Sequence, residues 1–178
     1  PIKIWCAAAS TGQEPYSIAM VIDQLGHKLA GSRVEILGTD ISERCLEKAK
    51  AGIYTQFEVQ RGLPVTQLMK YFRKEGDAWK IADSLKANIR FRHMNLLDDF
   101  RTLGRFDVIF CRNVLIYFDT PTKKRVLDRM SQQMDAPGYL LMGAAETVLG
   151  VTDAFKPVQN SRGLYSIDPA RTAMTRAA

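Results

Sequence analysis

The first fifty residues alternate between short apolar runs and apolar residues at helical spacing. The run at residues 2–7 predicts a strand, and the apolar positions from Ile18 to Leu29 recur every three or four residues, which predicts a helix. A second strand is predicted at residues 34–40, and a second helix at residues 43–51 with Ser42 as its N-cap. This strand–helix–strand–helix order is typical of a parallel sheet with right-handed crossovers.

The second half of the chain continues the same pattern. Strands are predicted at residues 88–94, 106–111, 139–144, 155–158 and 163–167, and an amphipathic helix at residues 120–134. The strand at 106–111 is apolar almost throughout, as expected of a parallel strand that is buried on both faces. We expect Pro137-Gly138 to form the turn that leads into the strand at 139–144.

One connection is much longer than the others. Residues 53–87 separate the second helix from the third strand, whereas such connections usually have ~2–6 residues. Residues 67–72 suggest a short helix, and the residues around Trp79 suggest a hairpin. We therefore expect a small α/β-hairpin unit inserted into the sheet domain. The last residues, 169–178, are expected to form a frayed, flexible tail.

Length and composition indicate a soluble globular domain. The chain has 178 residues, of which 46% are hydrophobic and 25% charged. No stretch approaches the ~18–20 apolar residues of a membrane span, and no signal peptide precedes the first strand. We therefore expect a cytoplasmic protein without membrane insertion. The chain opens with Pro1 directly before a strand, so we also expect it to be part of a longer protein.

The charge and the cysteine count exclude several classes of function. The 25 Lys and Arg residues outnumber the 19 Asp and Glu residues, which gives a net charge of +6, but the excess is spread along the chain. Such a distribution favours a solvated surface, or weak attraction to an acidic partner, over a nucleic-acid site. The densest cluster lies between Lys123 and Arg129, on the helix predicted at 120–134. Three cysteines in no C-x-x-C pair and two histidines argue against disulfides and a metal site.

Polar side chains follow the strands where a parallel sheet binds its ligands. Asp40 ends the second predicted strand, Asn95 follows the third, and Arg112 and Asn113 follow the fourth. An acid at the position of Asp40 can bind a ribose, or it can cap the next helix. The first loop has neither a G-x-G-x-x-G motif nor a Walker lysine. A nucleoside without phosphates therefore fits best, which points to S-adenosylmethionine (SAM).

The motifs at these strand ends resemble those of one family, the chemotaxis receptor methyltransferases (CheR). The resemblance runs from about Ile4 to Ile167, and it is carried by residues 7–17 (AAASTGQEPYS), 38–41 (GTDI), 95–97 (NLL) and 110–118 (FCRNVLIYF). It implies an α/β fold, a Rossmann-like class I SAM-dependent methyltransferase sheet over residues 1–168. It also implies a receptor-docking β-subdomain inserted at about 53–87, and an N-terminal helical domain that this chain lacks.

The resemblance also assigns site residues. It makes Tyr117 the catalytic residue, beside the methyl group that is transferred. The cofactor-binding residues that it implies are Gly12, Glu14, Asp40, Asn95, Leu96, Arg112 and Asn113. Among these, Glu14 is implied near the methionine end of SAM, Asp40 on the ribose, and Asn95 with Leu96 around the adenine. The chain departs from many relatives at Gln13, where they carry a second Glu.

The implied activity is SAM-dependent O-methylation of glutamate side chains on methyl-accepting chemotaxis receptors of bacteria, for sensory adaptation. The implied partner is the receptors' cytoplasmic helical bundle, and we expect a monomer and the product S-adenosylhomocysteine. Two alternatives stay open. One is a SAM-binding regulatory or scaffolding module, and the other is a methyltransferase acting on RNA or amines. Against the second, Arg112-Asn113-Val114-Leu115 stands where amino-group enzymes of this fold often carry Asn/Asp-Pro-Pro-aromatic.

Tyr117 has a competing interpretation of its own. A glutamate with a pKa near ~4.3 is already ionised at neutral pH, so its methylation needs no general base. We therefore expect the Tyr117 hydroxyl to orient the reacting groups. The alternative is that Tyr117 anchors the segment from Ile116 to Phe118 to the core. Cys111 is expected to be a buried, inert thiol because it follows apolar strand residues.

Overall fold

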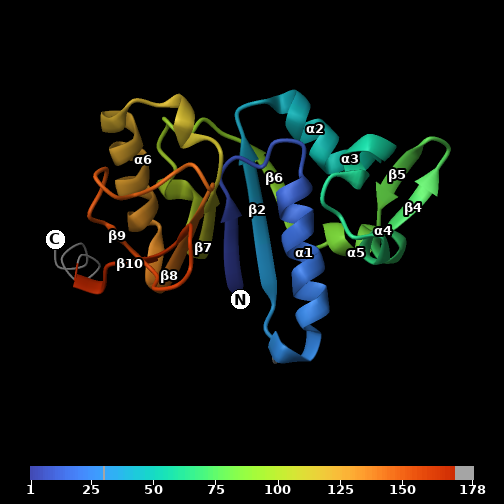
Figure 1. Ribbon diagram of the computed structural model, residues 1–178, viewed down its shortest axis with the longest axis horizontal. Helices are drawn as coiled ribbons and strands as arrows, with labels where there is room; N and C mark the ends of the chain where they lie inside the picture. The colour runs from blue at the N-terminus through green and yellow to red at the C-terminus, as the bar shows by residue number, and fades with distance from the viewer. Residues whose placement is uncertain (30, 171–178) are drawn as a thin grey trace.

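The computed structural model describes residues 1–29 and 31–170, which form two sheets (Figure 1). The larger sheet has the strand order β6-β2-β1-β7-β8-β10-β9. Its strands are β1 (Ile2–Cys6), β2 (Val34–Asp40), β6 (Ile89–His93), β7 (Phe106–Cys111), β8 (Met134–Met142), β9 (Phe155–Pro157) and β10 (Leu164–Ile167). The strands from β6 to β8 in this order pair in parallel, and β10 and β9 add antiparallel strands at one edge. The predicted parallel sheet is confirmed.

Helices cover both faces of this sheet. The α-helices of the sheet domain are α1 (Gln13–Leu25), α2 (Glu43–Ala51) and α6 (Thr120–Gln132), and the 3₁₀ helices are η1 (Gly26–Leu29), η2 (Arg101–Leu103) and η3 (Leu115–Tyr117). Figure 1 shows α6 on one side of the sheet and α1 on the other. Strand β1 contributes side chains to both faces of the sheet, because successive side chains of a strand point to opposite faces. Trp5 packs in the cluster that contains residues of α6, and Ile4 packs in the cluster that contains residues of α1.

The segment at 53–87 forms its own three-stranded sheet, with the order β3-β5-β4. Its elements are β3 (Ile53–Thr55), α3 (Gln56–Gln60), α4 (Val65–Tyr71), β4 (Phe72–Glu75), β5 (Ala78–Ile81) and α5 (Asp83–Lys86). The predicted helix and hairpin correspond to α4 and to β4 with β5. The inserted unit shares a core with α1, because Tyr71 and Ile81 belong to the same buried cluster as Met20. Tyr71 also donates a hydrogen bond to Asp23 of α1, at 2.8 Å.

The prediction of a turn at Pro137-Gly138 was wrong. Strand β8 begins at Met134 and runs through both residues, and α6 ends at Gln132, two residues earlier than predicted. The pairing with β7 shifts register between Phe106, opposite Met134, and Val108, opposite Tyr139. This irregularity places Pro137 where the strand has no regular partner, so the missing N–H of proline costs no ladder hydrogen bond.

Two further expectations concern the C-terminal tail and membrane-spanning helices. Of the predicted tail at 169–178, residues 171–178 lie outside the described residues. Within the described part of the chain, no helix combines the length and the apolar character that crossing a membrane requires.

Candidate active site

Two cavities meet at the carboxyl edge of the parallel strands. The larger has a volume of about 1040 Å³ and continues along the apolar side of α1, and the smaller has a volume of about 270 Å³. Both are lined by Ala8, Asp40, Ile41, Val114 and Tyr117. These residues come from the segments that follow β1, β2 and β7, which the sheet order brings side by side. The site therefore lies at the edge where parallel sheets bind their ligands.

Asp40 connects the two loops that begin this site. Its Oδ2 accepts a hydrogen bond from the Ser10 N–H at 2.8 Å, and its Oδ1 accepts one from the Ser42 N–H at 2.9 Å. Ser10 has a positive φ of 49°, so the first loop makes a sharp turn here. The N-cap of α2 is Ser42, whose hydroxyl accepts from the Cys45 N–H. Asp40 is therefore not the cap of that helix, which was one of its two interpretations.

Glu14 and Arg112 form an ion pair across the larger cavity, with Nη1 and Oε2 at 3.0 Å. Glu14 lies in the first turn of α1 and its side chain is 19% exposed, whereas that of Arg112 is 46% exposed. Burial raises the pKa of Glu14 above its ordinary value, and hydrogen bonds from Arg112 and the Cys6 thiol oppose this rise. The pair brings together the segments after β1 and β7, as the predicted site requires.

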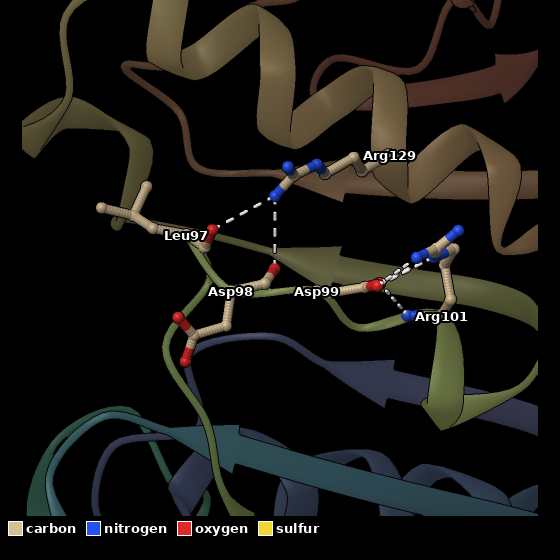
Figure 2. A network of polar contacts seen from close by, with 5 residues as sticks. All are labelled: Leu97, Asp98, Asp99, Arg101 and Arg129. Atoms are coloured by element: carbon tan, nitrogen blue, oxygen red, sulfur yellow. Dashed lines mark hydrogen bonds and ion pairs between the residues drawn. The ribbon is translucent and has the colours of Figure 1, made fainter.

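Asn95 and Leu96 line the smaller cavity, in the loop that follows β6. Asn95 Oδ1 accepts a hydrogen bond from the Leu97 N–H at 2.9 Å, which closes a local turn. Arg129 of α6 donates to the carbonyls of Leu97 and Asp98, at 3.2 and 3.3 Å (Figure 2). Arg129 therefore stabilises this loop, whereas its place in a cluster of charges suggested only a solvated helix surface.

The same loop is held a second time beyond Asp98. Figure 2 shows the Arg101 side chain and backbone N–H directed at the Asp99 carboxylate, with the side-chain contacts between 2.6 and 3.0 Å. The Arg101 guanidinium and the hydrogen bonds that it donates hold the pKa of Asp99 down, to about 2. Of these groups, Arg129 holds the residues that directly follow Asn95 and Leu96, and it does so without lining the cavity itself.

Tyr117 stands at the junction of the two cavities, in the 3₁₀ helix η3 that follows β7. Its side chain is 79% exposed, whereas that of Leu115, two residues earlier, is 1% exposed. Leu115 therefore anchors this segment to the core, and the anchoring interpretation of Tyr117 is wrong. The ring of Tyr117 is free to meet a ligand.

The turn that leads to Tyr117 is held by Glu146, a residue that the sequence analysis did not single out. Asn113 adopts the left-handed region at φ 57°, and the Glu146 carboxylate accepts hydrogen bonds from the backbone N–H groups of Asn113 and its two successors. Glu146 lies beyond β8, in an irregular segment with no motif around it. Nothing in the local pattern marks it, because the three partners that make up this turn lie more than thirty residues away.

Gly12 was predicted among the cofactor-binding residues, but it is absent from the lining of both cavities as the described residues form them. It is buried at the start of α1 with φ 95°, and a Cβ there would lie 2.8 Å from the Cβ of Ala49 and 3.1 Å from the Tyr54 hydroxyl. Its small size lets α1 approach α2 and the inserted sheet. Cys111 is fully buried, and burial, with Glu146 and Glu14 nearby, raises its pKa, as expected of an inert thiol.

The residues at this edge fit an adenosine group on structural grounds. An ionised carboxylate can accept about four hydrogen bonds, and Asp40 accepts two from the described backbone, so it keeps acceptor sites for two hydroxyl donors. The neighbouring small cavity has apolar walls, among them Met94, Leu96 and Phe118, with the Asn95 amide as a polar group. Within residues 1–29 and 31–170, no group of three His, Cys, Asp or Glu side chains is placed to hold a metal ion.

The fold identifies the general class to which this protein belongs. The chain is similar in fold to a TehB-like SAM-dependent methyltransferase from Corynebacterium glutamicum, with a TM-score of 0.54 and 16% identity over 93% of this chain and 78% of that one. It also resembles PKMT2 from Rickettsia typhi, solved in complex with AdoHcy, with a TM-score of 0.50 and 15% identity over 79% of this chain and 20% of that one. This is the Rossmann-like fold of SAM-dependent methyltransferases.

The family follows from the sequence comparison. Residues 1–164 match the family model described as CheR methyltransferase, SAM binding domain. The chain is 44% identical to the chemotaxis protein methyltransferase of Vibrio parahaemolyticus over 167 residues, and 41% identical to chemotaxis protein methyltransferase 1 of Pseudomonas aeruginosa over 169 residues. Each alignment covers 92% of this chain and 61% of the relative. The chain belongs to the CheR methyltransferase family, and it spans about three fifths of the length of these relatives.

Proposed function

We propose that the protein transfers the methyl group of SAM to glutamate side chains of methyl-accepting chemotaxis receptors, and that it does so in the cytoplasm as a monomer. What carries the proposal is the position of Tyr117. It lines both the small cavity beside Asn95 and the larger cavity that holds Glu14 and Arg112. The relatives' names, chemotaxis protein methyltransferases, support the choice of receptors as substrates.

In this proposal each strand end has one task toward the cofactor. Asp40 accepts the ribose hydroxyls with the acceptor sites that its two backbone partners leave open. Asn95 and Leu96 surround the adenine, and the Glu14–Arg112 pair adjoins the methionine end. The bound cofactor supplies a methyl group on a positively charged sulfur. A buried, ionised Glu14 favours a cationic neighbour, because burial otherwise destabilises its charge.

The acceptor needs alignment more than activation. A receptor glutamate is ionised at neutral pH, so one of its carboxylate oxygens would take the methyl group directly from bound SAM, whose sulfur would keep the electron pair of the broken bond. No proton has to move. The Tyr117 hydroxyl donates a hydrogen bond that orients the incoming carboxylate toward the reacting methyl group.

The inserted unit is the proposed docking surface for the receptor helices. It exposes the apolar side chains of Phe57, Val65 and Met69 and also carries exposed cations such as Arg73. A receptor helix with an apolar stripe and acidic glutamates would meet both groups on this surface. Lys70 is less available, because it is paired with Asp23 of α1 at 2.8 Å.

The docking proposal is tested by charge reversal at Arg73. Arg73→Glu should raise the KM for receptor by about 3- to 10-fold, and less at high salt, because exposed charges are screened. Arg90→Glu, on the exposed edge strand β6, is the matched control and should leave this KM unchanged. Equal effects of the two variants would remove the inserted unit from the docking role.

The activity itself is tested with methyl-labelled SAM. The intact protein is incubated with labelled SAM and membranes that contain receptors, and the label is then treated with base. Release of the label as methanol from the receptor band identifies a carboxyl methyl ester. Label that resists base, or label found in RNA or in small amines, would contradict the proposal. Binding of SAM without any transfer would indicate a regulatory or scaffolding module instead.

A further inference from the structure

The Glu146 carboxylate accepts so many backbone hydrogen bonds that it has no acceptor site left for a ligand. Oε2 accepts from the N–H groups of Asn113 at 2.7 Å and Gly143 at 2.9 Å, and Oε1 accepts from those of Val114 at 3.2 Å and Leu115 at 2.9 Å. All of these donors are backbone groups. The roughly four acceptor sites of a carboxylate are thereby filled.

The donors lie in the segments that follow two neighbouring strands. Asn113, Val114 and Leu115 follow β7, and Gly143 follows β8, which pairs with β7 in parallel. The N–H groups after β7 point away from the strand ladder because Asn113 adopts the left-handed conformation, with φ 57°. Without this acceptor the part-buried N–H groups of Val114, Leu115 and Gly143 would lose their hydrogen-bond partner, which is unfavourable for a buried donor. Glu146 therefore stabilises this turn against straighter alternatives.

The packing around the carboxylate leaves no spare room. A Cβ added at Gly143 would lie 2.3 Å from Oδ1 of Asn113 and 2.8 Å from Oε2 of Glu146. Real Cβ atoms do not approach other atoms so closely, so any side chain at position 143 would push the turn and the carboxylate apart. Gly143 and Glu146 therefore both contact Asn113, the residue at which the turn after β7 begins.

The turn leads directly to the residues that face the ligand. Arg112 precedes Asn113 and pairs with Glu14, and Tyr117 follows Leu115 within one turn of η3. The N–H of Tyr117 donates to the carbonyl of Val114 at 3.3 Å, so the position of Tyr117 depends on the turn that Glu146 holds. Glu146 itself lines neither cavity.

We propose that Glu146 is a positioning residue for methyl transfer, which holds the turn after β7 so that Tyr117 and Arg112 face the reacting groups. This inference rests on the proposed function for its effect on rate. The geometry of the turn is independent of the proposed function. A misplacement of about 1 Å at a reacting group can lower a rate about 100-fold, so the effect should appear in kcat. The cofactor contacts of Asp40 and Asn95 lie on other strand ends and should persist.

The test compares Glu146→Gln with Glu146→Asp in the intact protein. In Glu146→Gln the side-chain amide directs N–H donors at backbone N–H donors, and kcat should fall by about 10- to 100-fold. The KM for SAM and the affinity for S-adenosylhomocysteine should change by a smaller factor than kcat does, because Asp40 and Asn95 keep their places while only the Arg112–Asn113 end of the site moves. Glu146→Asp keeps the charge and should retain more of kcat than Glu146→Gln. Gly143→Ala should lower kcat as well, with Glu146 intact.

Asp107→Ala is the matched control, because Asp107 also accepts a backbone N–H, that of Lys3 at 2.8 Å, but at the opposite end of β7. It can lower stability without moving the turn, and its kcat per folded molecule should stay unchanged. A purely structural role for Glu146 would give the same result as this control. Equal kcat per folded molecule in Glu146→Gln and in the wild type would overturn the proposal.

Amide hydrogen exchange separates this inference from the proposed function. In the wild type the amides of Asn113, Val114 and Leu115 should be protected, and in Glu146→Gln they should exchange at least about 10-fold faster while the amides of β7 stay protected. If the wild-type protein transferred no methyl group, the proposed function would fail, whereas this exchange pattern would still decide the role in the turn. Unchanged protection of these amides in Glu146→Gln would contradict that role.

Discussion

Asp40 and Glu146 are two carboxylates that hold loops at the same edge of the sheet, and they differ in how many acceptor sites they have left. Asp40 accepts two backbone hydrogen bonds, from Ser10 and Ser42. Glu146 accepts four, from residues after β7 and β8. A carboxylate with open acceptor sites can bind a ligand, and a saturated one can only build the structure around it. The comparison therefore separates binding from positioning within one site.

The largest effect is expected for Asp40→Ala. It removes the acceptor for the ribose hydroxyls and also releases the loops at Ser10 and Ser42. Two hydrogen bonds to a charged group contribute about 1.5–3 kcal/mol each, so S-adenosylhomocysteine should bind at least about 100-fold more weakly, as calorimetry would measure. Asp107→Ala serves as the control and should bind with unchanged affinity. An unchanged affinity in Asp40→Ala would remove Asp40 from the binding group.

A smaller effect, on rate alone, is expected for Tyr117→Phe. The ring keeps its place in η3 because Leu115 anchors that segment, and only the hydroxyl is lost. The kcat for methyl transfer should fall by about 10-fold, while the affinity for S-adenosylhomocysteine stays within about 2-fold. Steady-state kinetics with receptor membranes measures the first quantity and calorimetry the second. A loss confined to cofactor affinity would place Tyr117 with Asp40 and not with the turn of Glu146.

Glu14 is a third carboxylate, and it is paired with a side chain instead of the backbone. The smallest of the expected effects concerns Glu14 and is an effect on the stability of the protein. Burial raises its pKa in the folded state above the usual value of 4.5. The folded state thus binds this proton more tightly than the unfolded state does. The stability that this provides is complete below pH 4.5, and it is lost as the pH rises through the raised folded pKa.

Glu14→Gln carries no charge at any pH, so it should escape this loss. The free energy of unfolding of the variant, relative to the wild type, should therefore increase as the pH rises above 4.5. Chemical denaturation at a series of pH values measures this difference. A difference that is flat, or that decreases with pH, would show that the pKa of Glu14 is not raised in the folded protein.

The local pattern of the sequence was sufficient for the sheet and for most of the site. Strands β2 and β7 have the predicted limits. For β7 the limits are plain in the pattern, because a largely apolar run lies between Arg105 and Arg112. Asp40, Asn95 and Arg112 could be placed at one edge because parallel strands end on the same side of a sheet. The resemblance to the CheR family then added Glu14 and Tyr117, whose roles remain proposals.

Features that depend on distant partners were not predictable in this way. The role of Glu146 in the turn depends on residues that follow another strand, and the role of Arg129 depends on the carbonyls of Leu97 and Asp98. Strand β3 has three residues, too few for a hydrophobic period to be recognised. The course of β8 through Pro137 depends on a register shift against β7, which no local signal encodes.

The central claim is that SAM binds at the carboxyl edge of the sheet, between Asp40 and the turn after β7. The most direct test is a titration of the ¹⁵N-labelled protein with S-adenosylhomocysteine, followed by the backbone amide shifts. The largest changes should fall on Ser10, Asn95 and Asn113. A third cavity, of about 520 Å³ and lined by Lys3 and Arg33, lies at the amino ends of β1 and β2 and serves as the alternative binding site. Shifts that cluster there, with the carboxyl edge unchanged, would contradict the account.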